Sequence, residues 1–108
     1  MSLPAEISVE ELKRMHDDAE PFVLLDVRED DEVATASVDF AKHIPMASVP
    51  ERLGELSKDG NIVVMCHGGG RSSRVAKYLR ENGFTSVANL AGGIDAWSEE
   101  IDPGVPRY

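Results

Sequence analysis

Hydrophobic residues fall into short runs along this 108-residue chain, and each run has the length of a strand. The most apolar is at residues 61–65, directly after the Asp59-Gly60 turn. Uninterrupted apolar runs of this length are typical of strands buried on both faces, as in parallel sheets. We predict four such strands, at residues 22–26, 46–49, 61–65 and 87–90.

Segments with helical spacing separate these runs. Ser8-Val-Glu-Glu11 has the form of a capping box, which starts a helix. Val75, Ala76 and Leu79 lie on one face of another amphipathic helix. The predicted helices cover residues 8–18, 29–36, 50–56 and 72–82, and a last one runs through Ala96 and Trp97.

The alternation of strands and helices predicts an α/β fold with a mainly parallel central sheet. The length suits one domain over residues 1–108, with its core at about residues 6–101. Residues 103–108 contain two prolines and a glycine, and we predict an irregular surface tail there and assign it no function.

Composition and charge narrow the function. The net charge of −9 disfavours nucleic acid and anionic membranes as partners. No apolar stretch approaches the ~20 residues that span a bilayer, and no secretory signal is visible. A lone cysteine excludes an intramolecular disulfide, which fits a reducing, cytoplasmic setting. With one cysteine and three dispersed histidines, we expect neither a metal site nor a cofactor.

The charge is unevenly distributed. Residues 66–80 contain no acidic residue but hold Arg71, Arg74, Lys77 and Arg80. Lys77 and Arg80 have two equally good interpretations: they help to bind an anion, or they only complement the C-terminal end of a helix. Arg71 lies beside the cysteine, and there we favour an anion-binding role.

Cys66 is the main candidate for chemistry. It follows the strand at residues 61–65 and precedes the helix at 72–82, and ligand sites of parallel sheets form at such strand ends. Gly68, Gly69 and Gly70 allow backbone conformations closed to other residues and bring amide groups close to a ligand. The amides, the helix N-terminus and Arg71 all favour an anion.

These surroundings predict a reactive thiolate. A free cysteine has a pKa of about 8.5, which cations and helix N-termini lower to roughly 3.5–7.5. Most lone cysteines are inert core residues, but Cys66 is followed by histidine, glycine and arginine rather than by apolar residues. His67 has two equally good interpretations, as a group that polarises a substrate or as a solvated loop residue.

Four motifs resemble those of one known family. They are Leu25-Asp-Val-Arg-Glu29, His43-Ile-Pro45 with Ala47, Cys66-His-Gly-Gly-Gly-Arg-Ser72 and Leu90-Ala-Gly-Gly-Ile-Asp-Ala-Trp97. In this order they resemble a single-domain rhodanese, a sulfurtransferase, across nearly the whole chain. The resemblance implies a five-stranded, mainly parallel sheet flanked by helices on both faces.

The resemblance also implies a mechanism. Cys66 would take sulfur from thiosulfate or a similar small anion as a persulfide, and a thiol or cyanide would remove it. The anion-binding loop would comprise His67, Gly68, Gly69, Gly70, Arg71 and Ser72. Asp26, Arg28 and Arg74 would support it, the first two by hydrogen bonds within the fold.

Three alternatives stay open. A persulfide carrier would use Cys66 to relay sulfur to a protein partner. A cysteine-dependent phosphatase of the same fold would need C-x5-R, whereas Cys66 and Arg71 form C-x4-R, a cradle sized for sulfur. An arsenate reductase would need a resolving cysteine, which the sequence lacks.

Overall fold

The computed structural model describes residues 2–108. Its centre is a five-stranded, fully parallel sheet with strand order β1-β5-β4-β2-β3. The strands are β1 (Glu6–Ile7), β2 (Val23–Asp26), β3 (Ala41–His43), β4 (Ile62–Met65) and β5 (Val87–Leu90). The predicted α/β class is therefore confirmed, with β4 at the centre of the sheet.

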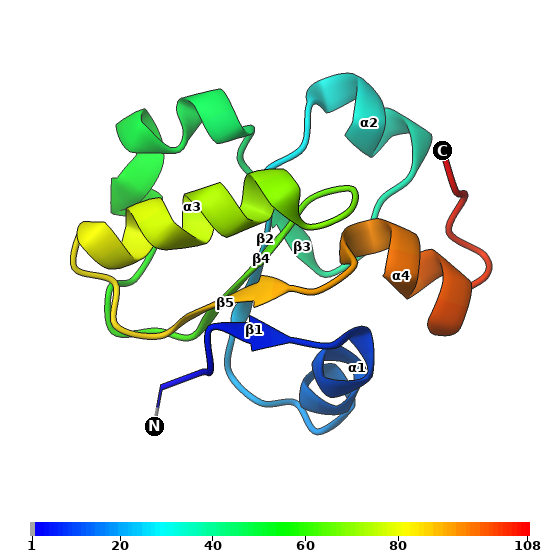
Figure 1. The fold of residues 1–108 in the computed structure, drawn as a ribbon, viewed down its shortest axis with the longest axis horizontal. Helices are drawn as coiled ribbons and strands as arrows, with labels where there is room; N and C mark the ends of the chain where they lie inside the picture. The colour runs from blue at the N-terminus through cyan, green and yellow to red at the C-terminus, as the bar shows by residue number, and fades with distance from the viewer. Residues whose placement is uncertain (1) are drawn as a thin grey trace.

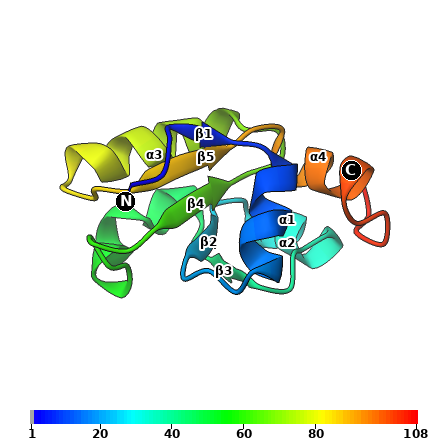
Figure 2. The same cartoon turned by 90° about the horizontal axis from the view of Figure 1, so that it is seen from below.

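Helices cover both faces of the sheet (Figures 1 and 2). The α-helices are α1 (Val9–Asp17), α2 (Asp30–Thr35), α3 (Gly70–Glu81) and α4 (Gly93–Glu100). Two 3-10 helices, η1 (Met46–Ser48) and η2 (Pro50–Glu55), join β3 to β4. Figure 1 shows α3 on one side of the sheet and α1 on the other.

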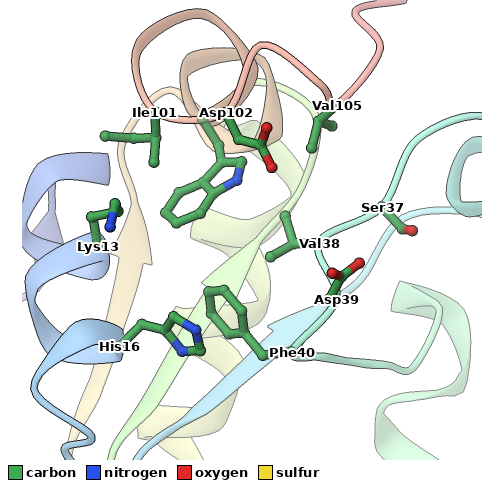
Figure 3. Close-up of a pocket in the computed structure, with 10 residues that line it drawn as sticks. Lys13, His16, Ser37, Val38, Asp39, Phe40, Ile101, Asp102 and Val105 are labelled. Atoms are coloured by element: carbon green, nitrogen blue, oxygen red, sulfur yellow. The ribbon is translucent and has the colours of Figure 1, made fainter.

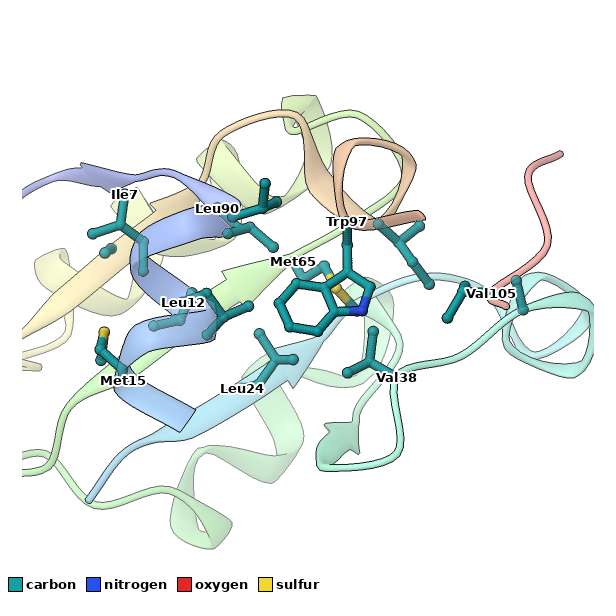
Figure 4. Packing of buried hydrophobic residues seen from close by; sticks show 14 residues of the cluster. Ile7, Leu12, Met15, Leu24, Val38, Met65, Leu90, Trp97 and Val105 are labelled. Carbon is teal, nitrogen blue, oxygen red and sulfur yellow. The ribbon is translucent and has the colours of Figure 1, made fainter. Parts of the chain in front are cut away.

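Residues of the interior strands β2, β4 and β5 contribute to two separate cores, one on each face of the sheet. On one face, Leu24, Val63 and Leu90 pack with apolar residues of α1 and with Trp97 of α4, as Figure 4 shows. On the other face, Leu25 and Val64 pack against α3 and the 3-10 helices. This two-sided burial is why the strands are apolar without alternation.

Most predicted helices are confirmed, with small shifts at their ends. Ser8 caps α1 by accepting a hydrogen bond from the Glu11 amide (3.1 Å), as the capping box predicts. Glu29 and Glu32 form a second capping box at α2. The helix predicted from residue 72 begins at Gly70, and the one predicted at residues 50–56 is a kinked 3-10 helix.

The strand predicted at residues 46–49 is wrong, because Met46–Ser48 is a 3-10 helix between two prolines. The strand in this region is Ala41–His43, which pairs with β2 at the sheet edge. Its residues are only half buried, so it lacks the continuous apolar pattern of an interior strand. Strand β1 was likewise not located from sequence, since it is two residues long.

No helix among residues 2–108 is long and apolar enough to cross a membrane.

Candidate active site

Cys66 lies directly after the central strand β4, at the C-terminal edge of the sheet. Its Sγ accepts a hydrogen bond from the Gly69 amide at 3.1 Å and lies 3.3 Å from the Ser72 hydroxyl. The residue is only 1% exposed, yet its sulfur faces the loop and the start of α3. The thiol is therefore surrounded by the polar groups that the sequence predicts.

Two opposing effects act on the ionisation of Cys66. Burial raises the pKa of the thiol, because the charged form loses hydration. Hydrogen bonds from the Ser72 hydroxyl and from the amides of Ser72, Gly69 and Arg71 lower it. The hydrogen bonds prevail, so the pKa of Cys66 lies below its ordinary value and the thiolate is more stable than that of a free cysteine.

Only one of the three loop glycines needs its conformational freedom. Gly69, the N-cap of α3, has a φ of 117°, which side chains with a Cβ rarely adopt. A Cβ on Gly68 or Gly70 would meet no atom within 4 Å. The prediction that all three glycines are conformationally special is therefore correct for Gly69 alone.

The N-terminus of α4 holds the cysteine loop from the other side. The amides of Ile94 and Asp95 donate to the carbonyl oxygens of Cys66 and His67, at 2.9 and 3.1 Å. A Cβ on Gly93 would come within 2.5 Å of the His67 oxygen. The segment from Leu90 to Trp97 thus supports the loop, and this close approach explains Gly93.

Arg71 is paired with a carboxylate rather than with Cys66. Its guanidinium makes a two-pronged ion pair with Glu32 of α2, at 2.6 and 2.9 Å. Arg71 holds the pKa of Glu32 at about 2, and the carboxylate in turn raises the pKa of Arg71. The Arg71 charge still acts on the Cys66 sulfur, but its hydrogen-bonding fork is occupied.

Asp26 and Arg28 form a buried ion pair beside this site. The Arg28 side chain is fully buried and donates to both Asp26 oxygens, at 2.9 and 2.7 Å. It also donates to the carbonyl oxygens of Glu32 and Ala36, which bracket the second half of α2. These contacts are consistent with the predicted supporting role, because they fix α2 above the end of β2.

Tyr108 is a contact residue that sequence reasoning missed. Its ring stacks on the His67 ring with centroids 4.3 Å apart, and its hydroxyl donates to Glu32 at 2.8 Å. Arg28 donates to the same hydroxyl at 3.0 Å. The predicted irregular tail is confirmed as irregular, but it packs on the site, and no local pattern signals this.

The two remaining predicted residues, His67 and Arg74, differ in how they are placed relative to the Cys66 loop. His67 is half buried, and among residues 2–108 its Nε2 has no hydrogen-bond partner. Arg74 is exposed on α3 and borders a small apolar cavity of about 220 Å³ with Met46 and Tyr78. No contact joins Arg74 to Cys66, so the structure does not bring this supporting candidate into the loop.

A larger groove, of about 410 Å³, is lined by residues of α1, of the segment before β3, and of α4 and the tail after it (Figure 3). Among its lining residues, His16 stacks on Phe40, and the Phe40 and Trp97 rings meet edge to face. None of its lining residues belongs to the Cys66 loop. The described residues contain no group of three or more acidic, histidine or cysteine side chains that fits a metal ion.

Comparison with known proteins agrees with this geometry. The family description "Rhodanese-like domain" matches residues 8–100. The chain superposes on a rhodanese-like domain protein from Staphylococcus aureus with a TM-score of 0.83 at 34% identity, over 100% of this chain and 99% of that one. The chain belongs to the rhodanese-like family.

Several relatives have names that concern sulfur, and two of them come from Bacillus subtilis. A putative sulfurtransferase of Bacillus subtilis, YtwF, is 45% identical over 91% of this chain and 94% of its own length. A putative sulfur carrier protein of the same species, YrkF, is 37% identical over 94% of this chain and 54% of its own length. Several longer plant relatives match as well, and of those proteins the chain spans only 23–27%.

Proposed function

We propose that this protein is a sulfurtransferase that carries a sulfane sulfur as a persulfide on Cys66, with thiosulfate or a related compound as donor. The observation that supports this most directly is the position of the Cys66 Sγ, 3.1 Å from the Gly69 amide at the N-terminus of α3. Amides in this place stabilise a sulfur anion, and a persulfide is also an anion.

The reaction takes place in two displacements. The Cys66 thiolate attacks the outer sulfur of thiosulfate, a new S–S bond forms, and sulfite leaves with the electron pair of the broken S–S bond. Cyanide or a thiolate then attacks the outer sulfur of the persulfide. The Cys66–S bond breaks, the acceptor gains the sulfur atom, and Cys66 returns as a thiolate.

Mass spectrometry of the intact protein tests this proposal. After treatment with thiosulfate, the wild type is expected to gain the mass of one sulfur atom and to lose it on addition of cyanide. Cys66→Ser, which keeps a similar side-chain volume, is the matched control and should stay unmodified. Absence of the adduct from the wild type, or an equal adduct on Cys66→Ser, would reject the mechanism.

A sulfur relay between proteins is the second candidate, and one observation favours it. The Arg71 fork is occupied by Glu32, so the site has less free positive charge for a small dianion than the sequence predicts. A donor that presents its persulfide on a protein side chain needs no such charge. Adduct formation with a protein persulfide, but not with thiosulfate, would favour the relay.

The phosphatase alternative is disfavoured by the same contact. A phosphate ester needs an arginine fork directed at its oxygens, and the Arg71 fork is directed at Glu32. Hydrolysis of para-nitrophenyl phosphate by the wild type, absent from Cys66→Ser, would reverse this ranking.

A further inference from the structure

The Ser72 hydroxyl lies between two acceptors. Its oxygen is 3.3 Å from the Cys66 Sγ and 2.5 Å from Oδ1 of Asn89, on strand β5. A serine hydroxyl has a single proton to donate. Ser72 and Asn89 are both buried, at 0% and 6% exposure. Ser72 can therefore donate to Cys66 or to Asn89, but not to both.

Glu6 decides which way the Asn89 amide points. Glu6 of β1 is the cross-strand partner of Asn89, and its carboxylate accepts a hydrogen bond from the Asn89 Nδ2 at 3.2 Å. A carboxylate only accepts, so the amide nitrogen must face Glu6. The amide oxygen then faces Ser72, and it too only accepts. In this arrangement the Ser72 proton is committed to Asn89.

We propose that Asn89, oriented by Glu6, is a positioning residue that governs when Cys66 ionises. With its proton on Asn89, Ser72 presents a lone pair to Cys66 and accepts a hydrogen bond from the thiol. When Cys66 loses its proton, the Ser72 hydroxyl turns to donate to the thiolate. That rotation breaks the bond to Asn89 and leaves a buried amide oxygen without a donor, which costs free energy. The Glu6–Asn89 pair thus opposes the loop amides and restrains the nucleophile.

Other charged groups around the loop do not take part in this relay. Arg71 acts on the Cys66 sulfur through its charge, and Glu32 is its ion-pair partner. His67 and Tyr108 stack on each other at the outer side of the loop. Within residues 2–108, no side-chain hydrogen bond or ion pair joins Glu6 or Asn89 to any of these four groups. Substitutions at Glu6 therefore leave the rest of the electrostatic environment in place.

Titration of Cys66 by the pH dependence of alkylation with iodoacetamide tests the proposal. In Glu6→Gln, the new amide can accept as well as donate, so the Asn89 amide is free to turn over. Its nitrogen then faces Ser72, and the Ser72 proton becomes available to the thiolate. We expect the titration midpoint to fall by about half to one pH unit, the value of one ordinary hydrogen bond.

Two controls separate this relay from a simple change of charge. Glu10→Gln removes an exposed carboxylate from the start of α1 and should leave the midpoint unchanged. In a Ser72→Ala background, Glu6→Gln should have no effect, because the hydroxyl that transmits it is gone. An unchanged or higher midpoint in Glu6→Gln, or an equal shift without Ser72, would overturn the proposal.

Asn89→Ala gives a second measurement and should lower the midpoint in the same direction. If this buried substitution prevents folding, Glu6→Gln still decides the question, because Glu6 is exposed. The proposal rests on Cys66 being the nucleophile of the proposed function. Its readout is thiol ionisation rather than sulfur transfer, so a protein with the predicted titration but no thiosulfate adduct would contradict only the proposed function.

Discussion

The two sides of the Cys66 loop stabilise charge in different ways. Toward α3, the sulfur faces uncharged polar groups, namely the Gly69 amide and the Ser72 hydroxyl. Toward α2, the site is lined by full charges that already neutralise each other, in the pairs Asp26–Arg28 and Glu32–Arg71. The first side can stabilise an anion through hydrogen bonds without carrying a charge of its own. The second side holds the fold and has little charge left to offer a substrate.

The largest effect is expected where a buried charge loses its partner. In Asp26→Ala, the fully buried Arg28 guanidinium keeps its charge but loses the carboxylate that accepts two of its hydrogen bonds. Such a loss costs about 3–5 kcal/mol of the free energy of unfolding. Denaturation in urea, followed by circular dichroism, measures it.

The control for this prediction is an exposed ion pair. Asp17→Ala breaks the ion pair with Lys13, in which both side chains are about half exposed. It should lower the free energy of unfolding by less than about 1 kcal/mol. If Asp26→Ala were no more destabilising than Asp17→Ala, the charged side of the loop would not be what holds α2 in place.

A smaller effect is expected where the neutral side meets α4. In Gly93→Ala, the new Cβ collides with the main chain of Cys66 and His67 at a residue whose φ is 57°. The loop must shift, so we expect a loss of about 2 kcal/mol in unfolding free energy together with slower alkylation of Cys66. Gly68→Ala, where a Cβ meets nothing within 4 Å, should change the stability by less than about 1 kcal/mol. Equal behaviour of the two variants would contradict this account of the loop.

The neutral side of the site was predictable from sequence and the charged side largely was not. Cys66, Gly69 and Ser72 are close in the chain, so a strand, a glycine loop and a helix suffice to place them together. The central strands were equally clear, because β4 is apolar throughout and β5 is apolar except for Asn89. Local pattern was enough wherever the neighbours in space are also neighbours in sequence.

The local sequence pattern does not indicate contacts between segments that are far apart in the chain. Glu32 belongs to an acidic stretch that predicts only a helix, and nothing in it indicates Arg71, 39 residues later, as its partner. Tyr108 reaches Glu32 across 76 residues, from a tail whose sequence predicts only irregular structure. The free Arg71 fork expected from the sequence was thus an overestimate, since the charge balance of the site depends on tertiary contacts.

The smallest effect concerns the binding of a negatively charged substrate. A single substitution should turn the charged side of the site into one that binds anions. Glu32→Gln keeps a hydrogen-bonding side chain but removes the carboxylate, so the Arg71 charge is no longer neutralised. We expect kcat/KM for thiosulfate to rise about three- to tenfold, chiefly through a lower KM, as for other rim charges near an anionic ligand.

Glu29→Gln is the matched control for Glu32→Gln, because it removes an equal charge from the same helix end without touching Arg71. It should leave kcat/KM for thiosulfate within about twofold, since an exposed charge is screened by salt. Acidification of the wild type should not imitate Glu32→Gln, because the pKa of Glu32 is about 2 and the pair stays ionised at any pH suited to the assay. A rise of the same size in both variants would mean that net charge, and not the release of Arg71, controls the use of thiosulfate.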